Sequence, residues 1–155
     1  SIIDPDSPEF YAGGNMEKKI QEFCRRTGQP VPETVGQVAR CVYESLALKY
    51  RHALEGLEKM KGQRIDSLNI VGGPINNRFL NQLIADSLDR KVVTGPVEGA
   101  AIGNLLTQAM ALGDIKDLAQ LRQVVRNSEK VDIWQPNHTQ AWEDAYQKLL
   151  TFLNK

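Results

Sequence analysis

The stretch IDSLNIVGGPINN, residues 65–77, decides the fold because it reads as a strand, a tight turn and the start of a helix. The run from Ile65 to Val71 is the best strand candidate in the chain, and its composition is typical of a parallel strand buried on both faces. The two glycines that follow it, Gly72 and Gly73, let the backbone turn sharply and approach a ligand closely. The sequence therefore predicts a strand–turn–helix unit of an α/β domain.

Helical periodicity surrounds this unit on both sides. We expect helices over 16–27, 33–61, 76–89, 97–112, 116–127 and 139–153, and short extended segments at 91–94 and 131–134. Asn15 is the expected cap of the first helix, and Thr34 or Glu33 begins the second. Gly28 and Gly62 are the expected ends of these two helices. Residues 1–14 carry no apolar period and read as an extended loop.

Two clear strands among so many helices are too few for a comfortable sheet. Sheets average ~5–6 strands, and an isolated two-stranded sheet is marginally stable in water. We therefore expect partner strands that precede Ser1, in a longer protein of which this chain is the C-terminal part. Without them, the strand at 65–71 would keep an open edge, and copies of the fragment could associate through that edge.

The charge balance excludes several classes of protein. Lys plus Arg number 19 and Asp plus Glu number 19, so the formal net charge is zero. A nucleic-acid binder or a polybasic membrane anchor would carry a basic excess. No apolar run approaches the ~20 residues of a membrane span, and no basic-then-apolar leader opens the chain. We expect a cytoplasmic globular protein with no nucleic-acid or membrane partner.

The cysteines and histidines do not have the spacing of a metal site, and we expect none. Cys24 lies near the end of the first expected helix, and Cys41 lies about two turns into the next. The stiff connector at 29–32 should fold these helices into an antiparallel pair. Both cysteines fall on apolar stripes, so we expect them to face each other as two buried thiols or as a disulfide. Cytosolic thiols are normally reduced, which favours the thiols.

The glycine turn is also the best candidate for a binding site. The helix after it would point its N-terminus at the turn, where free N–H groups and a partial positive charge favour an anion. Asn76 and Asn77 add polar side chains, and either could cap the helix. The same pattern is typical of an ordinary α/β turn, so the residues alone leave both interpretations open.

A longer run, NIVGGPINNRFLNQLIADSLDRKVVTGPVEGAAIGNLLTQAMALG at 69–113, resembles the C-terminal domain of the FGGY family of sugar kinases. The upstream stretches IDPDSPEFYAGGNM and FCRRTGQPVPETVGQVARCVYESLALKYR resemble the same family. Their most specific parts are QPVPET, ESLALKYR and GPVEGAAIGN, and the match covers nearly the whole chain in order.

This resemblance implies an actin-like (ribonuclease H-like) α/β fold, of which residues 1–155 form an incomplete, helix-rich C-terminal nucleotide-binding domain. It implies ATP and Mg²⁺ as cofactors, and transfer of the ATP γ-phosphate to a deoxyketose, L-rhamnulose. It places nucleotide binding at Gly72, Gly73 and Asn77. The family's sugar-binding residues and its catalytic Asp lie before this chain begins, so we expect the fragment alone to be inactive. Asp86 and Asp89 are then expected to be solvated positions.

The chain departs from the family pattern at Pro74, Ile75 and Asn76, where the family usually has Gly, Ser or Cys, and Gln. Pro74 removes one backbone donor, whereas the two glycines before it keep theirs. Two alternatives therefore stay open beside the L-rhamnulose kinase. One is a kinase for another deoxy sugar or ketose, and the other is a non-catalytic α/β interaction domain that has lost the site.

Overall fold

The computed structural model describes residues 1–137 and 140–153, so His138 and the expected helix start at 139 lie outside the described residues. Its helices are α1 (Met16–Arg26), α2 (Val35–Lys61), α3 (Arg78–Leu88), α4 (Gly99–Leu112), α5 (Leu118–Ser128) and α6 (Gln140–Leu153). Its strands are β1 (Ser67–Ile70), β2 (Lys91–Thr94) and β3 (Asp132–Trp134), and its 3₁₀ turns are η1 (Pro8–Phe10) and η2 (Gly73–Asn76). None of the helices within these described ranges has both the length and the apolar character needed to cross a membrane.

The predicted helix caps are confirmed. The Asn15 side chain accepts a hydrogen bond from the Lys18 N–H, and Thr34 forms a reciprocal capping box with Gln37. Gly62 ends α2 in the left-handed conformation, at φ 67°. Short-range chemistry therefore sets the bounds of the first two helices.

The sheet has three strands in the order β1-β2-β3. β1 and β2 are parallel, with Ser67 opposite Lys91, and β3 runs antiparallel to β2, with Ile133 opposite Val93. β2 is central, so β1 pairs with only one strand among the described residues, and the expected open edge is confirmed. Within this chain the strand is not buried on both faces, since Asn69 of β1 and Val71 just beyond it are exposed, and the partner strands expected to cover it stay a prediction.

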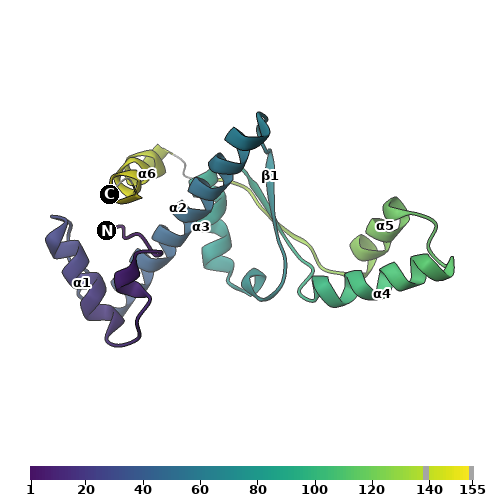
Figure 1. Ribbon diagram of the computed structural model, residues 1–155, viewed down its shortest axis with the longest axis horizontal. Helices are drawn as coiled ribbons and strands as arrows, with labels where there is room; N and C mark the ends of the chain where they lie inside the picture. Colours follow the sequence, from purple (N-terminus) through teal and green to yellow (C-terminus); the bar gives the residue numbers. More distant parts are fainter. Residues whose placement is uncertain (138–139, 154–155) are drawn as a thin grey trace.

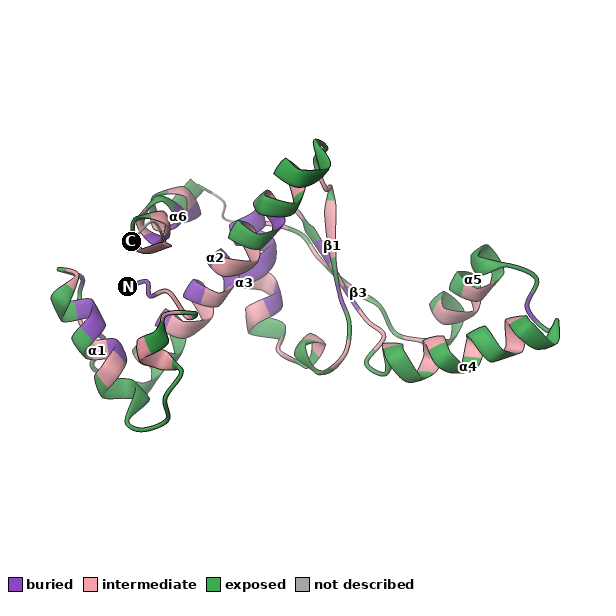
Figure 2. Ribbon diagram, in the orientation of Figure 1, coloured by how far each residue is buried: buried purple, intermediate pink, exposed green. Residues whose placement is uncertain are grey.

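The core lies where α2 and α3 pack on each other and α6 covers them, as the buried colour in Figure 2 shows. Leu48 of α2, Ile84 of α3 and Leu149 of α6 are fully buried. Ile2 joins the same cluster from the N-terminal segment, although the absence of periodicity there predicts only a loop. Phe79, in the first turn of α3, is 49% exposed, and its ring packs edge-on against Tyr43.

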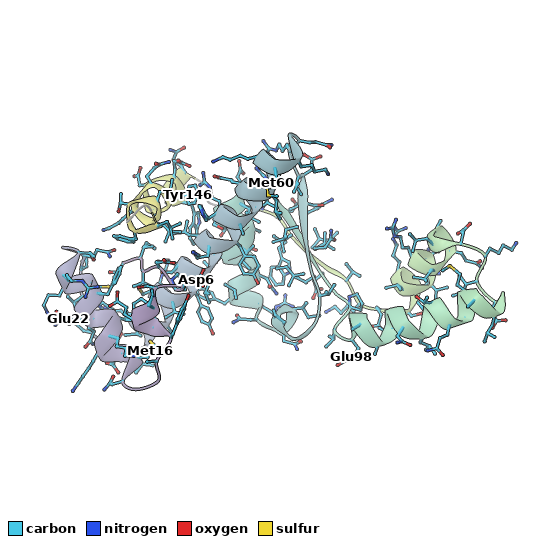
Figure 3. The ribbon with its side chains drawn as sticks, in the orientation of Figure 1. Asp6, Met16, Glu22, Met60, Glu98 and Tyr146 are labelled. Atoms are coloured by element: carbon cyan, nitrogen blue, oxygen red, sulfur yellow. The ribbon has the colours of Figure 1, made fainter. Side chains whose placement is uncertain are left out.

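A polar clamp reinforces the contact of α6 with α2. Tyr146 donates a hydrogen bond to Glu55 Oε2 at 2.8 Å, and Arg51 binds both Glu55 and Glu143, at 2.8 and 2.7 Å. The Arg51 guanidinium also lies 4.0 Å from the centre of the Tyr146 ring. Figure 3 shows Tyr146 between the two helices. Burial first, and then the bond to the Glu55 carboxylate, raise the pKa of the Tyr146 hydroxyl.

Helices α4 and α5 form an arm that extends away from this core on the far side of the sheet (Figure 1). α4 is rich in apolar residues but contains no buried residue. Leu105 and Leu112 are 66% and 82% exposed. A contiguous apolar helix face of this kind normally lies against another part of a protein.

Candidate functional site

The candidate site is the turn that leaves the carboxyl end of β1. Gly72 has φ 82°, a conformation that strains any residue with a Cβ. Its N–H donates to the Pro96 carbonyl at 3.2 Å, and its own carbonyl accepts from the Ile75 N–H. The Gly72 donor is therefore already engaged, contrary to the expectation that both glycines keep theirs for a ligand.

Gly73 is the open position of the turn. A Cβ built on it would meet no atom within 4 Å, and its φ lies outside the left-handed region. Its N–H has no acceptor among the residues that the structure describes. Gly73 therefore offers both a free donor and room for a ligand beside the backbone.

The start of α3 completes this side of the site. Asn77 is its N-cap, with the side-chain Oδ1 accepting from the Leu80 N–H at 3.0 Å. That bond commits the oxygen of Asn77 and leaves its amide NH₂ for other partners. The N–H groups of Arg78 and Phe79, at the first two helical positions, have no acceptor in the described part of the chain.

A second loop lies against this turn, because parallel strands end at the same edge of a sheet. The Gly95 N–H donates to the Ile70 carbonyl at 3.0 Å, which ties the end of β2 to the end of β1. A Cβ at Gly95 would approach the Lys130 carbonyl oxygen to 2.6 Å, so only glycine fits. Glu98, labelled in Figure 3, precedes α4 and makes no side-chain cap. Gly95 directly follows β2 and has a positive φ of 124°.

Asp86 is not the solvated residue that the sequence suggested. Its side chain is buried, and Oδ1 accepts from Gln82 Nε2 and from the Asn137 N–H, each at 2.8 Å. Those two bonds satisfy a buried carboxylate and fasten the segment after β3 to α3. Asp89 is exposed, as expected, and ends α3 in the left-handed conformation.

Acidic and imidazole side chains do not gather into a metal-binding group at this site. Within residues 1–137 and 140–153, no three His, Cys, Asp or Glu side chains lie close enough to hold a metal ion. The turn therefore offers backbone N–H donors and amide groups, which suit an anion such as a phosphate rather than a cation.

The two cysteines lie away from the turn, in a small apolar cluster between α1, α2 and the N-terminal segment. Cys24 and Cys41 are both buried as free thiols in this cluster, together with Ile3, Ile20 and Phe23. Burial, and next the neighbouring Cys24 thiol, raise the pKa of Cys41 to about 12. Cys41 is thus a poor nucleophile in the folded protein.

The burial of Cys41 predicts that its thiol reacts slowly with alkylating reagents. We expect Cys41 to resist alkylation by iodoacetamide at pH 8 and to react at the ordinary rate once the protein is unfolded. Since its folded pKa exceeds the unfolded value, its contribution to stability is complete below about pH 9 and is lost as the pH rises toward 12. Peptide mapping of the alkylated wild-type protein separates Cys41 from Cys24, and fast alkylation of Cys41 in the native protein would contradict the prediction.

The chain is similar to a known protein family and to several of its members. The model for the C-terminal domain of the FGGY family of carbohydrate kinases matches residues 1–112. The rhamnulokinase of Bacteroides thetaiotaomicron is 44% identical over 146 residues, which cover 94% of this chain and 30% of that protein. The rhamnulokinase of Enterococcus faecalis is 44% identical over 138 residues, covering 88% of this chain and 28% of that protein. The chain thus spans less than a third of the length of these relatives.

Solved structures share the fold. The xylulose kinase of Rhodospirillum rubrum superposes with a TM-score of 0.63 at 21% identity, over 82% of this chain and 26% of that one. The gluconate kinase of Lactobacillus acidophilus gives a TM-score of 0.62 at 21% identity, over 76% of this chain and 24% of that one. These superpositions confirm the α/β, actin-like fold class that the sequence predicted.

Proposed function

The chain belongs to the FGGY family of carbohydrate kinases, and we propose that it is the nucleotide-binding part of an ATP-dependent rhamnulokinase. The full-length protein phosphorylates L-rhamnulose to L-rhamnulose 1-phosphate, a step of rhamnose breakdown. One observation carries this proposal: the 44% identity to a rhamnulokinase extends over 94% of the chain, including the turn and its flanking strands. Because ATP is the phosphate donor, we place the enzyme in the cytoplasm.

The geometry of the turn supports a nucleotide there. The Gly73 N–H and the first two N–H groups of α3 have no acceptor in the described part of the chain, and a Cβ at Gly73 would meet no atom within 4 Å. A phosphate at a helix N-terminus gains ~0.3–1 kcal/mol when exposed and up to ~2 kcal/mol when partly buried. We assign Gly73 to the ATP phosphates and the Asn77 amide to the adenosine side. Gly72 shapes the turn, since its own donor is engaged.

The remaining chemistry belongs to other parts of the protein. Mg²⁺ bound with ATP would supply neutralisation of the charge on the transferred phosphoryl group. The described residues of this chain form no cluster for that ion, and we assign it to none of them. The base that deprotonates the sugar hydroxyl and the sugar pocket also lie outside residues 1–155, so the fragment alone is inactive.

Two alternatives have a specific basis. The residues that select the sugar lie outside this chain. The first alternative is therefore a kinase for another deoxy sugar or ketose. A non-catalytic interaction domain is favoured by the turn itself, where Pro74 has no N–H and the Gly72 N–H is already engaged.

The test is an assay of the purified full-length protein for ADP release with L-rhamnulose, L-fuculose and D-xylulose, together with a calorimetric titration with ATP. We expect ATP binding, and turnover that is fastest with L-rhamnulose. Faster turnover with another ketose would change the substrate assigned to the protein but would still identify it as a sugar kinase. Failure to bind ATP would favour the alternative of a non-catalytic interaction domain.

A further inference from the structure

Asn81 lies fully buried on α3, one helical turn after the cap residue Asn77. Its side-chain Nδ2 donates to the Ile75 carbonyl at 2.8 Å, and Ile75 is in the middle of the η2 turn. Its backbone N–H donates to the Asn77 carbonyl at 3.0 Å. Asn81 therefore connects the body of α3 directly to the turn that carries Gly73.

The other end of the Asn81 amide has no partner. Its Oδ1 is buried and accepts no hydrogen bond within the part of the chain that the structure describes. Buried polar atoms are normally paired, and an unpaired acceptor lowers stability. Leucine has a similar size and would avoid that loss. Stability alone therefore does not explain an asparagine here, whereas the bond from Nδ2 to the turn does.

The turn needs such an anchor. A 3₁₀ segment this short is weakly held by its own hydrogen bonds, and Pro74 contributes no donor to it. Gly72 and Gly73 have more backbone freedom than other residues. The Nδ2 bond is the contact that fixes the Ile75 carbonyl from the core side.

We propose that Asn81 is a positioning residue, which holds η2 in the conformation that presents the Gly73 N–H to the nucleotide. The inference rests on the proposed nucleotide site and adds a residue that does not itself touch the ligand. It requires Asn81 to act on ATP affinity without acting on the sugar.

The experiment uses the full-length protein with Asn81→Leu, which keeps the branched shape of the side chain, and Asn81→Asp, which replaces the donor by an oxygen facing the Ile75 carbonyl. Ser87→Ala is the matched control, because Ser87 is a buried polar residue of the same helix whose hydroxyl bonds the Ala47 carbonyl of α2 instead. For both Asn81 variants we expect the KM for ATP to rise about five- to tenfold, with an unchanged KM for the sugar. The Ser87→Ala control should have the wild-type KM for ATP and the wild-type KM for the sugar.

A second readout needs no nucleotide. In the ligand-free protein, the Ile75 and Asn77 amides should exchange hydrogen faster in the Asn81 variants than in wild type and in Ser87→Ala. Unchanged exchange, or a KM for ATP that rises equally in Ser87→Ala, would overturn the proposal. If only the Asn81→Asp variant folds, its KM for ATP and its exchange rates test the proposal without the Asn81→Leu variant. Faster exchange in a protein that binds no ATP would uphold the anchor and refute the nucleotide site, so the two failures are distinguishable.

Discussion

A Gly73→Val variant of the full-length protein is expected to raise the KM for ATP by about ten- to a hundredfold, the effect of losing one or two charge-assisted hydrogen bonds. The added side chain would occupy the space beside the only free donor among the two glycines. In the proposed function the sugar is bound by residues outside this chain, so its KM should stay unchanged. Steady-state kinetics with each substrate varied in turn measure both values.

The structure makes this variant a clean probe. A Cβ at Gly73 meets no protein atom within 4 Å, so the fold should tolerate it, whereas a substitution at Gly72 would be strained by its φ of 82°. Gly13→Val is the matched control, because that glycine is equally open and lies in the N-terminal loop. An unchanged KM for ATP in Gly73→Val would remove the turn from the nucleotide site.

The second large effect concerns the arm. We expect another part of the full-length protein to cover the apolar face of α4, so Leu105→Asp should lower the protein's free energy of unfolding by about 2–4 kcal/mol. Leu105 is largely exposed here, while the chain spans only 30% of the rhamnulokinase relative. The edge of β1 is a second surface that has no partner strand among the described residues. Urea denaturation measures the loss.

Thr107→Asp is the control for this prediction. Residue 107 is exposed, and it lies ~200° around the helix from residue 105, at ~100° per residue. The same charge there should cost less than about 0.5 kcal/mol. Equal, small losses in both variants would mean that nothing covers the apolar face of α4.

The sequence predicted the features that depend on neighbouring residues. Asn15, Thr34 and Gly62 carry their signals within three or four positions, and the structure confirms all three caps. The strand at 91–94 was predicted with the bounds that β2 has. The predicted strand at 65–71 and helix at 76–89 enclose β1 and α3, so local chemistry also located the candidate turn between them.

Features that depend on distant residues were not predictable in this way. The Gly72 donor is engaged by Pro96, which comes from another loop. Asp86 is buried, and its carboxylate is paired by the N–H of Asn137, 51 positions later. Asn81 reads in sequence as an ordinary helix residue, and only the folded turn brings the Ile75 carbonyl to its amide. Burial of the strand at 65–71 on both faces depends on neighbouring strands that this chain does not supply. Those neighbouring strands stay a prediction.

Hydrogen exchange of the full-length protein with and without ATP tests the central claim most directly, because it reports on the turn without any substitution. We predict that peptides covering residues 72–80 exchange more slowly when ATP is bound, while those from the α4–α5 arm do not change. ATP binding that protects other segments and leaves residues 72–80 unchanged would contradict a nucleotide site at this turn.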